Sequence, residues 1–344
     1  MKKTVPFLLF VAIILPFMAG CGGNIDEDEP DIPIPSPPEP KEDIRFGTGY
    51  PEINLTWLEE GGYEVSFKTD GAVFKPYEAV ICIEVFPENL QTSSHIYAHY
   101  SDATINGNKL ICTGALSSKE GSGFEVEDTY SIEDETISLS RSISVKTFTG
   151  ADYAYNSYFL LKDASEGSIS GYDYLLPSLI YKSSENLTGH SIGSNLNDDW
   201  ILAREDRMGL PFTMFRNTAS GISASITDFN LNPSTVDSDF GLSHMVNGDF
   251  SYGSLGYFNR MGYPVLAYCY PGSEGQRTYS DGGGASSSRW ARRSHPVRTN
   301  CKHEYCLKIQ FSKSEDFPES VKYHWRKAFD TYQPEIAEIN IEDI

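Results

Sequence analysis

The chain has 344 residues, of which 40% are hydrophobic, and its formal net charge is −21 at pH 7. That much negative charge excludes nucleic acid as a natural partner, because phosphate backbones bind cationic surfaces. The length is enough for one large domain or two smaller ones with a substantial core. The glycine run Gly282-Gly283-Gly284 lacks the lysine of a phosphate-binding loop and no dinucleotide fingerprint is present, so we expect no cofactor.

The first residues have the pattern of a bacterial lipoprotein signal. Lys2 and Lys3 precede an apolar stretch at 5–17, which is too short to span a bilayer, and small residues lead into Cys21. We therefore expect residues 1–20 to be removed and Cys21 to carry a lipid that anchors the protein to a membrane. Loss of the two lysines would change the net charge from −21 to −23. An ordinary secretory signal or a buried N-terminal helix is the alternative.

Residues 21–46 are expected to form a tether. Eight acidic residues and six prolines lie between Gly22 and Arg45, a composition that favours extended chain over a core. The acidic run at 26–29 resembles the export signal of surface-exposed lipoproteins of the Bacteroidota, which implies an outer-membrane lipoprotein exposed at the cell surface. The alternative is a solvated linker that carries no export signal.

Residues 47–311 have the pattern of an all-β domain. Serines occupy the even positions of 137–145 and mostly apolar residues the odd ones, as in a half-buried strand. Arg141 lies on the apolar face there, so we expect it to have a buried carboxylate partner. Gly, Asn, Asp and Ser separate further strands predicted at 53–57, 63–67, 80–86, 109–113, 155–161 and 305–311. Together these segments predict a large antiparallel β-sandwich.

The last segment, residues 312–344, predicts one C-terminal amphipathic helix. Apolar residues recur at helical spacing from Phe317 to Tyr332, with Pro318 in the first turn and Pro334 beyond the end. Its Trp325 requires cover, so the helix either packs back on the sandwich or has lost a partner.

We expect no metal site. Five cysteines remain besides Cys21, and the segment Cys301-Lys302-His303-Glu304-Tyr305-Cys306 resembles one only superficially. Strand alternation places His303 and Cys306 on opposite faces, which spoils shared coordination. Cys82 and Cys112 fall in predicted strands, as core residues or as a disulfide.

One candidate glycan-binding segment contains Trp200, Arg204 and Asp206. Carboxylate and guanidinium groups form bidentate hydrogen bonds to sugar hydroxyls, and the indole offers a flat apolar face. The alternative is an internal knot of salt bridges with the neighbouring Glu205 and Arg207.

A second candidate follows a glycine- and serine-rich stretch and contains Arg289, Trp290, Arg292, Arg293 and His295. A local cationic patch beside an indole suits an anionic glycan such as a uronic-acid polymer. The alternative is that these arginines neutralise the carboxylates of the domain itself.

An ordered set of short motifs resembles the N-terminal β-supersandwich of Bacteroidota polysaccharide-degrading lipoproteins, in which an (α/α) toroid follows. The motifs are residues 173–177, 180–181, 192–194, 204–211, 294–297, 303–305, 325–329 and 332–334. The resemblance implies a β-supersandwich and a glycan-processing setting. It carries over no catalytic residue, because the catalytic groups of that architecture belong largely to the toroid or the cleft beside it.

Three functions follow from these features. The leading hypothesis is a non-catalytic, surface-anchored sandwich module of a truncated polysaccharide-degrading enzyme, with residues 312–344 starting a missing helical domain. A complete glycan-binding surface lipoprotein and a fimbria or surface-layer subunit are the alternatives. No hydrolase nucleophile motif is present, so we expect this chain by itself not to be an enzyme.

Overall fold

The computed structural model describes residues 38–87, 93–178, 180–182, 200–205, 208–229, 253–258, 262–272, 294–299 and 301–333. All of them belong to one compact unit, Pro37–Ile344. Cys21 and most of the tether therefore lie outside the described residues. Within that described part, no helix is both long and apolar enough to cross a membrane.

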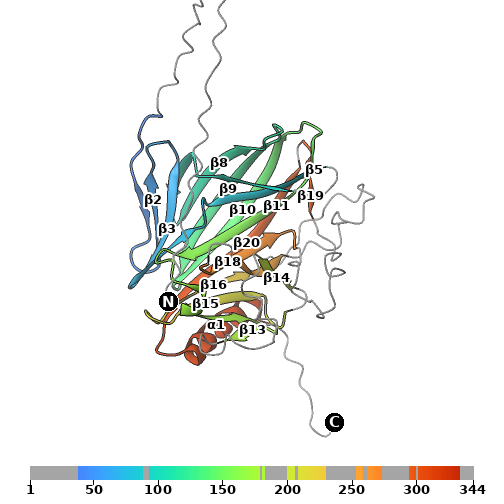
Figure 1. The fold of residues 1–344 in the computed structure, drawn as a ribbon. Coiled ribbons are helices and arrows are strands. Elements are labelled where there is room, and N and C mark those ends of the chain that lie inside the picture. The colour runs from blue at the N-terminus through green and yellow to red at the C-terminus, as the bar shows by residue number, and fades with distance from the viewer. Residues whose placement is uncertain are drawn as a thin grey trace, which may run out of the picture. The chain divides into compact units, whose positions relative to one another are not determined.

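The first of two antiparallel sheets contains the early strands and the centre of the chain (Figure 1). Its hydrogen-bonded order is β1-β2-β3-β4-β11-β18-β17-β14; β5 and β19 also pair with β11, and β6 pairs with β5. The bounds are β1 Ile44–Phe46, β2 Glu52–Trp57, β3 Tyr63–Thr69, β4 Ala72–Pro76, β5 Ile81–Pro87, β6 Ser94–Ala98, β11 Asp152–Asp163, β14 Trp200–Arg204, β17 Ser254–Phe258, β18 Val265–Tyr270 and β19 His295–Pro296.

The second sheet has the order β13-β12-β15-β16-β20-β10-β9-β8-β7. The bounds are β7 Asp102–Asn106, β8 Lys109–Ser117, β9 Gly123–Glu133, β10 Thr136–Thr147, β12 Tyr172–Leu176, β13 Ile180–Lys182, β15 Phe212–Asn217, β16 Ile222–Asp228 and β20 Lys302–Lys313. A short 3-10 helix, η1 (Ile169–Gly171), precedes β12. The predicted all-β sandwich is confirmed, and each strand predicted from the sequence matches a strand of these sheets.

The two sheets enclose one apolar core to which both contribute. Strand β10 shows how the sequence directs this: Ile137, Leu139, Ile143 and Val145 are fully buried, while the intervening serines face outward. The strand β20 alternates in the same way and buries His303 while Cys306 takes the other face, as predicted. Alternation of period two therefore fixes which face of each strand meets the opposite sheet.

A buried arginine, paired with a carboxylate of its own sheet, ties the two sheets together inside this core. Arg141 has no exposed surface, and its Nε and Nη2 donate to the carboxylate of Asp128 on β9 at 2.8 and 2.6 Å. Its remaining N–H groups donate to the Val80 and Tyr158 carbonyls and to the Tyr305 hydroxyl at 2.9, 3.2 and 3.2 Å. The predicted carboxylate partner is confirmed, and every donor of the guanidinium is used.

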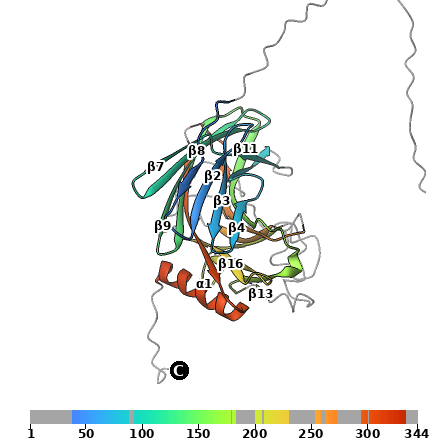
Figure 2. The ribbon, with the colours of Figure 1, turned by 90° about the vertical axis from the view of Figure 1, so that its left-hand side faces the viewer.

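The helix α1 (Phe317–Tyr332) has the predicted bounds. The Asp316 carboxylate caps it by accepting from the Glu319 N–H at 2.9 Å. Figure 2 shows α1 beside the second sheet, and its apolar side chains pack on the face of β12 and β15 that points away from the core. The Trp325 ring meets Phe212 edge to face, with the centroids 5.9 Å apart.

A buried histidine fixes the seat of α1 on β16. His324 is fully buried, and its two ring nitrogens lie 2.8 and 2.7 Å from the hydroxyls of Ser223 and Ser225. Burial lowers the pKa of His324 to about 3. The helix thus packs back on the sandwich, the first of the two alternatives.

Cys82 and Cys112 are both core residues. Cys82 lies in β5 of the first sheet and Cys112 in β8 of the second, each about 1% exposed or less, and neither forms a disulfide. Burial raises the pKa of both thiols well above the ordinary value, so they resist ionisation and oxidation.

Candidate functional site

Most of the predicted site residues lie outside the described part of the chain. They are Cys21, predicted to carry the lipid, and the glycan-binding candidates Asp206, Arg289, Trp290, Arg292 and Arg293. Trp200 and Arg204 form the two ends of β14, which is the last strand on one side of the first sheet. The structure therefore places Trp200 and Arg204 on the last described strand of this sheet.

His295 lies inside the sandwich. It is 0% exposed, pairs with Tyr155 across β19 and β11, and stacks on His303 with ring centroids 3.5 Å apart. Burial, with a smaller contribution from His303, lowers the pKa of His295 well below its ordinary value. Its ring is enclosed between the sheets in this structure, so we assign it to the core and not to a binding surface.

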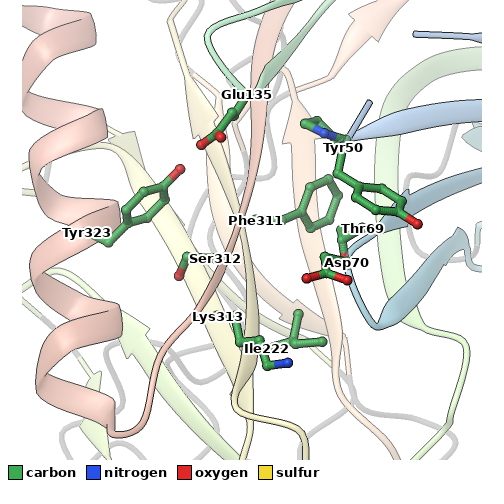
Figure 3. Close-up of a pocket in the computed structure, with 10 residues that line it drawn as sticks. Tyr50, Thr69, Asp70, Glu135, Ile222, Phe311, Ser312, Lys313 and Tyr323 are labelled. Atoms are coloured by element: carbon green, nitrogen blue, oxygen red, sulfur yellow. The ribbon is translucent and has the colours of Figure 1, made fainter. Parts of the chain in front are cut away.

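A cavity of about 310 Å³ opens where the ends of strands from both sheets meet α1 (Figure 3). We call it the end groove. Its lining residues are Tyr50, Pro51, Thr69, Asp70, Glu135, Ile222, Phe311, Ser312, Lys313 and Tyr323. They come from the segment before β2, the β3–β4 and β9–β10 turns, the start of β16, the end of β20 and the middle of α1.

The floor of the end groove is apolar. Ile222 and Phe311 are 3% and 8% exposed and lie on adjacent, paired strands, where Phe311 is opposite Ala224. The Phe311 ring packs on Phe74 of β4 with centroids 4.8 Å apart. The floor is thus the outermost layer of the core, and it is rigid because core packing holds it from below.

Two tyrosines stand on opposite sides of this floor (Figure 3). Tyr50 is 50% exposed, an unusual state for a large aromatic side chain. The hydroxyl of Tyr323 is buried but finds no hydrogen-bond partner among the described residues. Burial and the negative charge of Glu135 raise the pKa of Tyr323, so the hydroxyl stays protonated and can donate a hydrogen bond.

The wall formed by α1 is held in place by two contacts. Lys327, one helical turn after Tyr323, donates to the Asp134 carbonyl at 3.3 Å and lies 5.8 Å from the centre of the Tyr323 ring. The hydroxyl of Ser312 lies 2.7 Å from that of Ser223, which contacts His324. The groove is therefore preorganised by Lys327, Ser223 and His324, which do not themselves line it.

The chemistry of the end groove suits a small polar ligand with an apolar face. Asp70, Glu135 and Lys313 lie around the apolar floor and supply carboxylate acceptors and an ammonium donor. The volume is at the lower end of the range for small-molecule sites. Within the described ranges, no group of three or more His, Cys, Asp or Glu is placed to hold a metal ion.

Sequence reasoning missed the end groove. Tyr50, Asp70, Glu135 and Tyr323 lie in four separate segments, and none belongs to a recognisable motif. Glu135 sits in a turn with a φ of 61°, where Asn, Asp or Gly is more usual, but this backbone conformation is visible only in the structure.

No protein-family model matches this sequence, and no curated protein sequence matches it. Several solved structures are similar at low identity. An α-N-acetylgalactosaminidase from Bifidobacterium bifidum in complex with GalNAc matches with 8% identity and a TM-score of 0.44, over 83% of this chain and 38% of that enzyme. A galactose mutarotase-like protein from Clostridium acetobutylicum matches with 11% identity and a TM-score of 0.42, over 80% of this chain and 98% of that protein. A second, from Lactobacillus casei, matches with 10% identity and a TM-score of 0.40, over 79% and 100%.

This chain thus corresponds to less than two fifths of the Bifidobacterium enzyme. At such identities and TM-scores, these similarities carry no argument about ligand or activity. What stands on its own residues is an antiparallel β-sandwich with a preformed end groove.

Proposed function

We propose that this protein binds carbohydrate in the end groove. One observation carries the proposal: the half-exposed ring of Tyr50 and the Tyr323 side chain flank an apolar floor edged by Asp70, Glu135 and Lys313. A pyranose ring has an apolar face that packs on aromatic side chains and hydroxyls that bind carboxylate, ammonium and phenol groups.

The sequence adds a cellular setting to this proposal. The residues before Cys21 support a lipid anchor, and the acidic, proline-rich tether supports exposure at the surface of an outer membrane. A surface-anchored, non-catalytic module that holds polysaccharide for a degrading enzyme fits these features. The arginine-rich segment around Trp290 remains a second proposed contact, for an anionic glycan.

Affinity electrophoresis in gels that contain one polysaccharide at a time tests the proposal. The panel contains neutral polymers (starch, xylan, galactan and galactomannan) and anionic ones (polygalacturonate and alginate). We expect retention by at least one polymer, and we expect Tyr50→Ala to weaken binding about two- to tenfold, since an aromatic contact contributes about 0.5–1.5 kcal/mol. Tyr181→Ala is the matched control, because Tyr181 is 55% exposed and lies outside the end groove.

Two results would overturn the proposal. One is a wild-type protein that no polymer retains; the other is retention that Tyr50→Ala leaves unchanged. Release of reducing ends from a retained polymer would contradict the non-catalytic part alone. Retention of an anionic polymer that Trp290→Ala and Arg292→Ala abolish, with Tyr50→Ala neutral, would move the binding site to the arginine-rich segment.

A further inference from the structure

A second cavity, of about 930 Å³, adjoins the end groove. Tyr50 and Thr69 line both cavities, so the two cavities adjoin at Tyr50 and the end of β3. The other walls come from the connection between β11 and β12, which contains η1, and from the β15–β16 turn. We call it the side cavity. The two volumes together exceed what one sugar ring requires.

The Asp163 carboxylate, which accepts three hydrogen bonds, organises the wall of the side cavity. Asp163 accepts hydrogen bonds from the Asn217 side chain at 2.9 Å, from the Tyr172 hydroxyl at 3.1 Å and from the Ser165 N–H at 2.9 Å. The Asn217 oxygen in turn accepts from the Ala219 N–H at 3.0 Å. These bonds join β11, β12 and the β15–β16 turn, so the cavity keeps its form without a ligand.

Small neutral groups surround this fixed centre. The exposed hydroxyls on the wall belong to Ser165, Ser168, Thr218 and Ser220. A hydroxyl can both donate and accept, as recognition of a sugar hydroxyl requires, although that of Thr218 already donates to the Gly171 carbonyl at 2.9 Å and is left as an acceptor. Lys68 is the cation on the wall, and the carboxylate of Asp163 already has three donors.

The charges on the two cavities disfavour an anionic ligand. Lys68 and Lys313 are the cations that line them, against the carboxylates of Asp70, Glu135 and Asp163. The chain as a whole adds a net charge of −21. A polymer of uronic acids would be repelled by this surface, whereas a neutral chain of hydroxyl-bearing units would not.

We infer that the end groove and the side cavity bind consecutive units of one neutral polysaccharide chain, which crosses over Tyr50 and the β3–β4 turn. This inference rests on the proposed function and adds the class of ligand and its minimum extent. Tyr50 contacts units on both sides, Tyr323 donates its hydroxyl to a unit in the end groove, and the serine and threonine hydroxyls bind units in the side cavity.

Isothermal titration calorimetry with oligosaccharides of one to six units, made from the neutral polymer that the protein retains best, tests the inference. The affinity of the wild-type protein should rise at least tenfold from the disaccharide to the longest oligosaccharide. Ala219→Trp obstructs the side cavity with a bulky ring, because Ala219 is exposed on its wall and outside the end groove. This variant should remove the gain with length and leave disaccharide binding unchanged.

Tyr323→Phe tests the other end of the chain. It should weaken binding of every oligosaccharide about three- to tenfold, and it should not lower the urea midpoint of unfolding, because the hydroxyl it removes has no partner among the described residues. An unchanged urea midpoint therefore shows that weaker binding comes from loss of a ligand contact and not from loss of stability.

Three results would overturn the inference while the proposed function stands. In the first, the affinity of the wild-type protein does not rise with oligosaccharide length. In the second, Ala219→Trp binds long oligosaccharides as tightly as the wild-type protein does. In the third, polygalacturonate or alginate retains the protein more strongly than every neutral polymer does. Failure of the wild-type protein to bind any polymer overturns the proposed function, and the inference with it.

Discussion

The ion pair between Arg141 and Asp128 gives the sharpest test of how this core is held together. Arg141→Met keeps a long side chain but leaves the Asp128 carboxylate, which is 0% exposed, without its cation. Removing one partner of a buried pair costs about 3–5 kcal/mol. The carbonyls of Val80 and Tyr158 also lose a donor. We therefore expect the free energy of unfolding to fall by at least about 3 kcal/mol, much of the stability of an ordinary domain.

Urea unfolding, followed by tryptophan fluorescence with the slope checked for constancy, measures this loss. Lys146→Met is the matched control on the same two strands. Lys146 Nζ lies 2.8 Å from Glu125 Oε2, and the two side chains are 51% and 59% exposed. Breaking this exposed pair should change the free energy of unfolding by about 1 kcal/mol or less. The reasoning is refuted if Arg141→Met costs no more than Lys146→Met.

A double variant separates lost charge pairing from lost packing. Asp128→Asn in the Arg141→Met background removes the uncompensated carboxylate, so the combined loss should be smaller than the sum of the two single losses. Groups within one network couple by about 0.5–3 kcal/mol. Strict additivity would mean that the electrostatic pairing does not stabilise the fold.

Two further predictions concern acid and the helix. The folded pKa values of His295, His303 and His324 lie below the unfolded value, at about 4 for His303 and about 3 for His324, so the unfolded chain binds more protons and stability falls as the pH drops below about 6.5. Each histidine should contribute a slope of up to about 1.4 kcal/mol per pH unit between pH 6.5 and 4.5 in urea titrations; an unchanged slope in His324→Gln would contradict this. Trp325→Ala should lower the thermal midpoint and cost about 3 kcal/mol or less, since Trp325 is partly buried in the contact between α1 and the second sheet. Arg326 is the exposed neighbour of Trp325 on the helix, and Arg326→Ala should change the free energy of unfolding little. Equal losses from the two substitutions would argue against the packing of α1 on the second sheet.

The secondary structure of this chain is largely a local property. Serines alternate with apolar residues along β10, and each strand identified in this way is present. Asp316, Pro318 and the spacing of Val321, Trp325 and Ala328 define α1 within the same local window. Even the partner of Arg141 could be expected in kind, because a buried cation on an apolar face requires a carboxylate.

The end groove, the proposed binding site, could not be predicted from local sequence patterns. Aromatic and charged clusters in the sequence directed attention to Arg204 and to the residues around Trp290, while His295 proved to be enclosed in the core. The end groove instead joins Tyr50, Asp70, Glu135 and Tyr323, which are up to 273 positions apart in a chain numbered from 1 to 344. No local pattern marks such residues, because only the packing of their separate elements brings them together.

The sequence by itself determined that this protein is an all-β sandwich closed by one amphipathic helix, since periodicity, turn residues and caps act over a few neighbouring positions. Only the tertiary structure decided that α1 packs back on the second sheet, that Asp128 is the partner of Arg141, and that two cavities meet at Tyr50. These features depend on strand order and register. Order and register are set by the packing of the whole core, in which residues far apart in sequence become neighbours.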